Sequence, residues 1–284
     1  MALQTTVLKK LSILTTLFLF LGHQESAQAQ TTTQPLLSPA FYLPAETTVI
    51  YELCDISIPV KILQYGGRTG LLCINLHDNE TTSVNAAKEV LQYSGGTLVK
   101  IENRKQRLIR FRFRGQSYAF DPNRMFSREG ISQTLLENCG RKRNEVIDEI
   151  GKFAAFILSR IPDSVKCIVA LHNNTDEAFS VKSYIQAGNR EKDARDVKEQ
   201  PEQDVDDIVL TTDTTLFKVM GELGYNSILQ DNENARRDGS LSIWSGENGR
   251  RYINIETQHG KLDQYIEMLG KLLEWLQKEE TKEP

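Results

Sequence analysis

Histidine is scarce in this sequence of 284 residues, with four in all, and two of the four end apolar runs in the same way. His77 follows the apolar run 71–76, and Glu80 stands three positions later in a polar turn. His172 ends the apolar run 167–172 and is likewise followed by polar residues. If the two runs form neighbouring buried strands, both imidazoles and the carboxylate meet above the sheet, and this combination suits zinc. Each histidine alone is more simply explained as a packed or surface residue, so the hypothesis depends on the matched pair and on Glu80.

A hydrolytic zinc site also requires a group that takes a proton from the attacking water. Glu256 ends the apolar run 252–256 and could serve as this general base; an ordinary solvated glutamate at a strand end is the alternative. His259 follows three residues later. It could be a further polar group in the cleft, although a position on the surface or behind the metal ligands is the simpler interpretation.

An amide and a guanidinium stand side by side in the segment FDPNRMF, where Asn123 precedes Arg124. Such a pair can bind a substrate carboxylate, because arginine holds a carboxylate through two parallel hydrogen bonds. The alternative is an Asp-Pro turn in which the arginine is incidental. The segment is therefore a candidate anion-binding turn.

Taken in order, these residues resemble the pattern of the zinc carboxypeptidases and of the acylases that share their fold. That pattern comprises H-x-x-E, a later Asn-Arg pair often written D-x-N-R-x-F, a single histidine after a strand, and a glutamate after a late strand. The corresponding residues here are His77-Asp78-Asn79-Glu80, Asp121-Pro122-Asn123-Arg124-Met125-Phe126, His172 and Glu256. The resemblance spans most of the chain beyond its N-terminal segment, and the ordered combination is much more specific than H-x-x-E alone.

The resemblance implies a role for each of these positions. One zinc ion would be held by His77, Glu80 and His172. Glu256 would act as the general base, while the Asn-Arg pair would hold a substrate carboxylate.

The family also uses an upstream arginine, which polarises the scissile carbonyl and stabilises the oxyanion. Our candidate is Arg107, because it begins the strand that leads to the Asn-Arg turn. Three further arginines on this strand compete with it, and for each of the four a solvated strand face is the simpler explanation. The competitors are Arg110, Arg112 and Arg114.

The interval between the two histidines is short for a digestive carboxypeptidase. It is closer to the compact branch that includes aspartoacylase and succinylglutamate desuccinylase. The specificity residues of neither branch can be placed in this sequence, so the choice of substrate stays open.

Three functions follow from this resemblance. The first is a secreted or periplasmic zinc hydrolase that cleaves an amide bond next to a free carboxylate, with peptides, including those of the cell wall, as substrates. The second is an N-acyl amino acid deacylase, which the compact spacing favours and an export signal disfavours. The third is a non-catalytic binding protein on the same fold, but the presence of all three ligands and of Glu256 argues against it.

The composition is that of a globular protein, with 39% apolar and 25% charged residues. The formal net charge of −4 argues against binding of nucleic acid across the whole surface. We therefore expect no nucleic acid as a partner, and the resemblance implies a peptide or an N-acyl amino acid as the substrate. The sequence does not indicate an oligomeric state.

The N-terminal residues 1–29 have the pattern of a secretory signal peptide. Lys9 and Lys10 precede the apolar segment 11–22, and Ala27-Gln28-Ala29 gives a small-x-small cleavage site. The apolar segment is short for a bilayer span, which needs ~20 residues, so an uncleaved anchor is the weaker alternative. We expect no membrane association after cleavage. The Pro- and Thr-rich residues 30–46 would be a lead-in to a catalytic domain over 47–284.

Beyond the lead-in, strand and helix patterns alternate to the end of the chain. Strands are predicted at 48–54, 57–63, 71–76, 96–102, 107–115, 167–172, 226–231 and 250–256. Helices are predicted at 81–96, with Thr or Ser at its start, and at 130–139, 144–161, 211–225 and 261–280. This alternation predicts one α/β domain with a central mixed, largely parallel sheet flanked by helices, as in zinc carboxypeptidases.

Two further features remain open. The charged segment 188–207 reads as a surface loop or insertion. The four cysteines allow three disulfide pairings, among which the sequence cannot choose. Cys73 and Cys167 lie in apolar runs and are most simply small buried side chains. The cysteines are Cys54, Cys73, Cys139 and Cys167.

Overall fold

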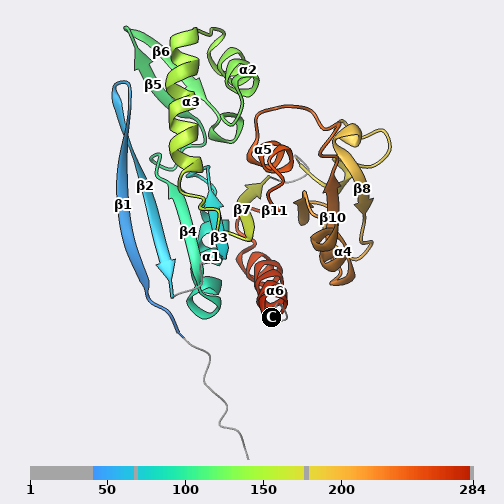
Figure 1. Ribbon diagram of the computed structural model, residues 1–284. Helices are drawn as coiled ribbons and strands as arrows, with labels where there is room; N and C mark the ends of the chain where they lie inside the picture. Colours follow the sequence, from blue (N-terminus) through green and yellow to red (C-terminus); the bar gives the residue numbers. More distant parts are fainter. Residues whose placement is uncertain (1–40, 67–69, 176–178, 282–284) are drawn as a thin grey trace, which may run out of the picture. The chain divides into compact units, whose positions relative to one another are not determined.

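The computed structural model describes residues 41–66, 70–175 and 179–281, and within them a nine-stranded sheet dominates the chain (Figure 1). The strands are ordered β1-β2-β4-β3-β7-β11-β9-β10-β8. Their bounds are β1 Pro44–Leu53, β2 Ile56–Tyr65, β3 Leu71–Asn75, β4 Gly96–Ile101, β7 Cys167–Asn174, β8 Ala194–Lys198, β9 Ile208–Thr211, β10 Asn226–Gln230 and β11 Tyr252–Gln258. A separate hairpin consists of β5 Ile109–Phe113 and β6 Gln116–Phe120.

The centre of the sheet is parallel. Strands β4, β3, β7 and β11 run side by side in the same direction, whereas β1, β2, β9 and β8 each pair antiparallel with a neighbour. Every residue of β3 and β7 is buried, as expected for parallel strands covered on both faces. The predicted α/β fold with a mixed, largely parallel central sheet is confirmed.

Six α-helices cover the two faces of this sheet. One apolar core joins α2, α3 and α5 to one face, and the other joins α1, α4 and α6 to the opposite face. The helix bounds are α1 Thr81–Ser94, α2 Arg128–Cys139, α3 Asn144–Leu158, α4 Thr214–Glu222, α5 Leu241–Glu247 and α6 Leu262–Glu280. Within residues 41–66, 70–175 and 179–281, no helix is long and apolar enough to cross a membrane.

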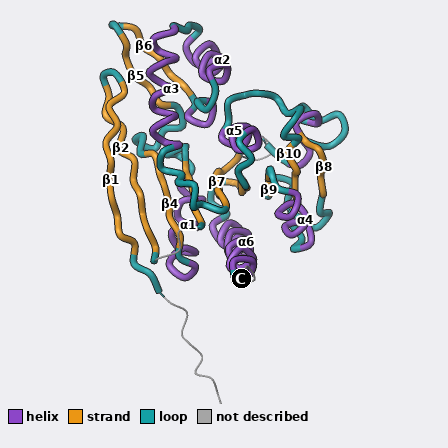
Figure 2. The backbone as a smooth tube through the Cα atoms, viewed as in Figure 1, coloured by secondary structure: helices purple, strands orange, loops and turns teal. Residues whose placement is uncertain are grey.

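The hairpin β5–β6 packs beside α2 and α3 and sets the position of the segment that follows it (Figure 2). Its turn places Arg114 and Gly115 at φ of 49° and 76°, as in the tight turns that match the twist of a hairpin. Phe120 anchors the end of β6 in the core. Asp121 and the short 3₁₀ helix η1 (Pro122–Arg124) come next.

Several elements differ from the sequence prediction. The segment 188–207 is not a plain loop, because it contains the edge strand β8, which pairs antiparallel with β10. The strands β6 and β9 and the helix α5 were not predicted; all three are short. The strand β1 begins at Pro44, inside the expected lead-in 30–46. The N-cap of α1 is Glu80 rather than Thr or Ser, and its side chain makes no capping bond.

The helix α6 buries one face against the sheet. Leu269, Leu273 and Leu276 are buried at helical spacing, while Leu262 and Ile266 are only partly buried. Tyr265 is buried as well, and its hydroxyl donates to the carbonyl of Ile255 in β11 at 2.9 Å.

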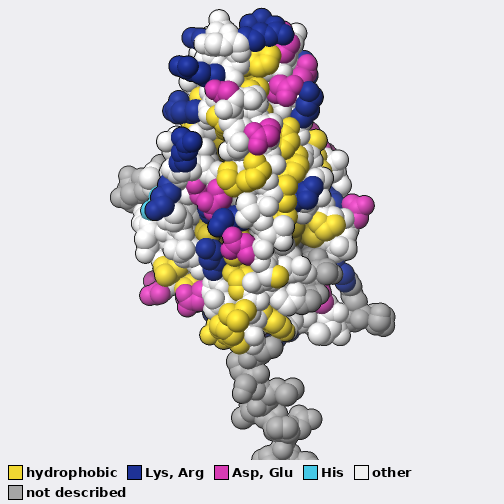
Figure 3. Space-filling view, turned by 90° about the vertical axis from the view of Figure 1, so that its left-hand side faces the viewer, with side chains coloured by type: hydrophobic (Ala, Val, Ile, Leu, Met, Phe, Trp, Pro, Cys, Tyr) yellow, Lys and Arg dark blue, Asp and Glu magenta, His cyan; other side chains and the backbone are white. Residues whose placement is uncertain are grey.

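The face on the β1 side carries apolar side chains among charged ones (Figure 3). Phe41, Leu43 and Ile50 are among the exposed large apolar side chains. Cys54, at the turn after β1, and Cys139, the last residue of α2, are free thiols. Cys73 and Cys167 are buried in β3 and β7, as predicted. The predicted signal peptide and most of the predicted lead-in lie outside the described residues.

Two glycines allow the segment after η1 to meet the segment before α5. An added Cβ at Gly130 would lie 2.6 Å from Cα of Gly239 and from the carbonyl oxygen of Arg124. The amide of Phe126 donates to the carbonyl of Gly239 at 3.0 Å. Since Gly239 also has a φ of +75°, both its backbone conformation and its close contact require glycine.

This contact predicts that two glycine-to-alanine variants lose different amounts of stability. In Gly239→Ala, the new methyl group would lie 2.7 Å from the carbonyl oxygen of Arg124. In the control Gly249→Ala, φ is also positive, at +60°, but nothing lies within 4 Å. Left-handed backbone should cost both variants about 1–2 kcal/mol, and overpacking should cost Gly239→Ala a further ~1–3 kcal/mol. Denaturant unfolding of both variants measures the difference, and equal losses would show that the close contact is unimportant.

Candidate active site

His77 and Glu80 belong to one tight turn between β3 and α1. The amide of Glu80 donates to the carbonyl of His77 at 3.1 Å, so the two side chains leave the same turn. The hydroxyl of Ser83 donates to the carbonyl of Glu80 at 2.8 Å and fixes the first turn of α1. The carboxylate of Glu80 thus lies at a helix N-terminus, where negative charge is stabilised.

His172 reaches the same place from β7. The strands β3 and β7 pair in parallel, so the turn after β3 and the last residues of β7 lie at one edge of the sheet. The rings of His77 and His172 are 5.2 Å apart between centroids. His172 was expected at the end of its strand, but β7 continues to Asn174 because its pairing with β11 continues to that residue.

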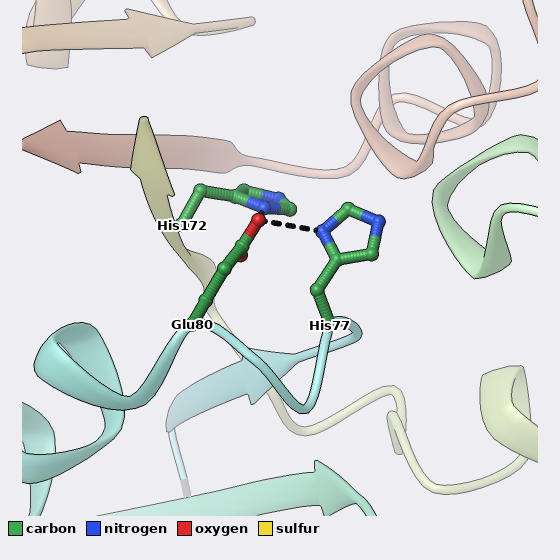
Figure 4. Close-up of side chains that lie close together, drawn as sticks. All are labelled: His77, Glu80 and His172. Carbon is green, nitrogen blue, oxygen red and sulfur yellow. Dashed lines mark hydrogen bonds and ion pairs between the residues drawn. The ribbon is translucent and has the colours of Figure 1, made fainter. Parts of the chain in front are cut away.

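The three predicted metal-binding side chains converge (Figure 4). Nδ1 of His77 lies 2.9 Å from Oε1 of Glu80, and Nδ1 of His172 lies 2.9 Å from Oε2. The three side chains are at most 6% exposed, and one ligand atom from each lies within 4.8 Å of the others.

The surroundings of Nδ1 of His77 show whether these three side chains fit a metal ion. The atom is buried and, among the described residues, has no hydrogen-bond partner. It nevertheless lies 2.9 Å from Oε1 of Glu80. The two atoms are therefore close without the geometry of donor and acceptor, as when both face a common point. Two imidazoles and one carboxylate with this convergence fit a zinc ion.

Asp121 holds His77 from behind. Its Oδ1 lies 2.7 Å from Nε2 of His77, and a carboxylate at this position orients a histidine whose other nitrogen faces a metal. Burial alone would lower the pKa of His77, but Glu80 and Asp121 raise it to about 9. Burial would raise the pKa of Glu80, yet the two histidines hold it well below its usual range. The carboxylates of Glu80 and Asp121 thus stabilise positive charge between the converging side chains.

Arg107 links these two carboxylates. Its Nη1 donates to Oε1 of Glu80 at 2.8 Å, and its Nη2 lies 3.1 Å from Oδ2 of Asp121. Half of the side chain is accessible, at 46%, so it borders the cavity while staying fixed at two points. The three competing arginines do not line this cavity. Arg110 and Arg112 lie on the exposed face of β5, and Arg114, in the turn after β5, pairs with Glu145.

Asp78 fixes the loop that precedes Arg107. Its carboxylate accepts from Nζ of Lys100 at 2.5 Å and from the amides of Asn103 and Lys105 at 2.7 Å. Arg104 and Lys105 adopt positive φ, a strained backbone that needs such support. Burial would raise the pKa of Asp78, but these bonds lower it.

Asn123 and Arg124 are clamped against the segment before α5. The side-chain oxygen of Asn123 accepts from the amide of Leu241 at 3.0 Å, so only its amide nitrogen remains for a ligand. Nη1 of Arg124 donates to the carbonyl of Asn123 at 2.7 Å, and Nη2 lies 3.5 Å from Oδ2 of Asp238. The Asn-Arg pair is therefore held in place by its neighbours and does not stand in an unsupported turn.

Glu256 lies beside His172, because the two residues are partners in the parallel pairing of β11 with β7. It was expected at the end of its strand, but β11 continues to Gln258. Its Oε1 accepts from Nδ2 of Asn254 at 2.9 Å. Burial raises its pKa, although His172 and Asn254 oppose the shift. A carboxylate with a raised pKa is better matched to accepting protons near neutral pH.

These groups share one cavity of about 460 Å³. Among the predicted residues, all but His77 line it, and His77 lies buried behind Glu80. His259 is exposed and lines the border of the cavity, so both interpretations of this residue stay open. The sequence did not indicate the polar residues of the far wall. These are Tyr184, Arg190, Asp238, Ser240, Ser242, Tyr252 and Asn254.

One signal could have revealed part of this wall. Tyr252 and Asn254 precede Glu256 at intervals of two, so on a strand they share its face. Nothing comparable points to Arg190, which stands in a segment rich in charge of both signs.

No family model matches the sequence, and no curated protein is significantly similar to it. Among solved structures, the chain is similar to a protein of Shewanella amazonensis described as a succinylglutamate desuccinylase/aspartoacylase family member. The identity is 11% and the TM-score 0.40, over 82% of this chain and 72% of that one.

The chain is also similar to thrombin activatable fibrinolysis inhibitor, with 13% identity and a TM-score of 0.47 over 84% of this chain and 70% of that one. A metallo-carboxypeptidase of Burkholderia cenocepacia gives 10% identity and a TM-score of 0.40, over 81% and 65% of the two chains. The similar structures thus include both branches that the sequence resembles. At these values the similarity concerns the fold and carries no argument about activity.

The hydrogen bonds of Asp78 to Lys100, Asn103 and Lys105 predict that the loop before Arg107 opens locally when the carboxylate is lost. In Asp78→Asn, the ion pair with Lys100 disappears and the amides of Asn103 and Lys105 lose a charged acceptor, a loss of about 1.5–3 kcal/mol per bond. Hydrogen exchange at these two amides should accelerate at least about tenfold. Glu102→Gln is the control, because Glu102 also contacts Lys100 but is more exposed. Unchanged exchange in Asp78→Asn would contradict the assignment.

Proposed function

We propose that this protein is a metal-dependent hydrolase that cleaves an amide bond next to a free carboxylate, in the manner of a metallocarboxypeptidase. The observation that carries the proposal is the convergence of His77, Glu80 and His172 at one end of a cavity that Glu256 and Arg124 also line. Zinc is the proposed ion, since the donor set is two imidazoles and one carboxylate.

A zinc ion held there would polarise the scissile carbonyl and lower the pKa of a water molecule. Glu256 would accept a proton from the attacking water and pass it to the leaving amine. Arg107, which Glu80 and Asp121 hold in position, would donate to the oxygen that becomes negative. Arg124 and the amide nitrogen of Asn123 would bind the free carboxylate and so set the distance to the scissile bond.

The substrate and the compartment complete the proposal. The N-terminal sequence pattern supports export, and outside the cytoplasm peptides, including those of the cell wall, are natural substrates. The second candidate is an N-acyl amino acid deacylase. A cavity of about 460 Å³ favours it, because that volume suits a small molecule. Hydrolysis of acylated dipeptides compared with N-acyl amino acids separates the two.

The metal proposal predicts the metal content of two histidine variants. The purified chain should bind about one zinc ion, and His172→Ala should lose it, because two ligands hold zinc far more weakly than three. His259→Ala is the matched control and should keep the ion, since that imidazole is exposed and outside the converging set. If the unmutated chain binds no zinc even after zinc is added, the hydrolase proposal fails and a binding role on this fold becomes the better account.

The role of Glu256 predicts a loss of rate without a loss of metal. In Glu256→Gln, kcat on a cleaved substrate should fall about 10²–10⁴-fold, the usual contribution of a general base, while zinc stays bound. Glu247→Gln, an exposed glutamate of α5, is the control and should keep full activity. A Glu256→Gln variant that retains most of its kcat would remove this residue from the mechanism.

A further inference from the structure

The hairpin β5–β6 and the residues around it concentrate positive charge on one part of the molecule. Residues 103–120 contain six Lys or Arg residues and no Asp or Glu, whereas the whole chain has a formal net charge of −4. A further run of three cations, at 141–143, follows α2. Lys and Arg side chains gather in the upper part of the face in Figure 3, where Figure 1 places the hairpin. The positive charge is therefore local.

Three of these cations line one hollow beside the hairpin, which we call the basic groove. Arg110, Arg112 and Arg141 border a space of about 560 Å³ that shares no lining residue with the candidate active site. Among its described lining residues, the one carboxylate is that of Asp55, whose Oδ1 accepts from the amide of Arg112 at 2.6 Å. The basic groove therefore keeps an excess of positive charge.

The guanidinium groups of the basic groove are not paired with carboxylates of the chain. Among the residues that the structure describes, Arg110, Arg112 and Arg141 form no ion pair, whereas Arg114 at the tip of the hairpin pairs with Glu145 at 3.2 Å. A guanidinium carries five N–H donors. Most of the hydrogen-bonding capacity of the three groups is thus left for an anionic ligand, which would also relieve the repulsion between them.

The spacing along β5 indicates which kind of anion fits. Arg110 and Arg112 are both exposed and Phe111 between them is buried, so the two guanidinium groups leave the same face of the strand. Two residues span roughly 7 Å along a strand, and an extended peptide has the same repeat. A peptide with glutamate or aspartate at alternate positions would therefore present its carboxylates to both arginines at once.

The strand β6 connects the basic groove to the candidate active site. The two arginines pair across the hairpin with Ala119 and Ser117, which precede Asp121 by two and four residues. At about 3.4 Å per residue, these positions lie roughly 7 and 14 Å from Asp121 along the strand. Asp121 itself contacts His77 at 2.7 Å. A single extended peptide is thus long enough to occupy both places.

We propose that the basic groove binds an acidic stretch of a peptide, upstream of the bond that the candidate active site would cleave. In the proposed function the free carboxylate lies at Arg124 and the scissile carbonyl at Arg107. The upstream residues then continue past Arg107, which shortly precedes β5. The inference rests on the proposed function for this direction of the peptide, whereas binding of the acidic stretch itself needs no catalysis.

Binding of an uncleavable probe tests the groove directly. The probe is a fluorescein-labelled octapeptide of alternating glutamate and serine with an amidated C-terminus, so that it has no free α-carboxylate for the active site. By fluorescence anisotropy it should bind at least about tenfold tighter than the same peptide with glutamine in place of glutamate. It should also bind more tightly than an isomer with four consecutive glutamates, and added salt should weaken the binding.

The two isomers carry the same charge, so they separate a fitted site from general attraction. Equal affinity for both would overturn the proposal. A single-stranded oligonucleotide or a phosphatidylglycerol vesicle that binds more tightly than the alternating peptide at physiological salt would overturn it too, because the groove would then belong to another partner.

Substitution of the exposed arginines locates the binding. Arg110→Gln and Arg112→Gln should each weaken binding of the alternating peptide about fivefold, the upper value for an exposed ion pair, and the double variant should lose at least about tenfold. Zinc content should not change. Arg128→Gln is the matched control, since Arg128 is exposed, pairs with Asp148 at 2.5 Å and does not line the groove. Full affinity in the double variant would refute the assignment.

Hydrolysis separates this inference from the function on which it rests. If peptides with a free C-terminus and acidic residues upstream are cleaved with a lower KM than their glutamine analogues, and the double variant removes the difference, both proposals stand. If the amidated probe binds through Arg110 and Arg112 but no peptide is cleaved, the hydrolase proposal fails and the acidic-peptide groove stands. If cleavage occurs without any effect of upstream charge, the hydrolase stands and the role of the groove is refuted.

Discussion

The buried carboxylate of Glu80 is the interaction on which the site depends. A carboxylate that is 1% exposed is costly unless it is fully paired. Here His77, His172 and Arg107 all contact it within 2.9 Å. These three partners come from different parts of the chain, so one buried charge fixes the mutual positions of the turn after β3, the strand β7 and the loop before β5.

The parallel centre of the sheet makes this convergence possible. Parallel strands end at the same edge, so the turn after β3 and the last residues of β7 and β11 meet there. The antiparallel flank adds part of the far wall of the cavity, because the pairing of β8 with β10 holds the segment that contains Arg190. The rest of that wall comes from β11 and from the segments before α5 and before β8.

The sequence predicted the converging side chains and Glu256 far better than the residues of the far wall. His77, Glu80, His172 and Glu256 adjoin long apolar runs, and such runs mark central strands. Short elements such as β8, β9 and α5 have little periodicity, so they escaped prediction. Arg190 could not be found because its position depends on a turn closed by its amide and the carbonyl of Ser183, on stacking over Phe179 and on the edge strand β8. None of these leaves a recognisable pattern in the sequence. The N-cap of α1 was missed for a different reason, as Glu80 turns its carboxylate toward the histidines.

The spacing of the converging side chains also has a consequence for how the chain folds. His77 and Glu80 are local neighbours, but His172 is 92 residues beyond Glu80. Contacts of such long range form late, since the loop between them must close first. A metal ion therefore cannot template the early steps of folding, as it does in small zinc-binding domains. It would be captured by a nearly complete fold, and the apo protein should already possess its native sheet.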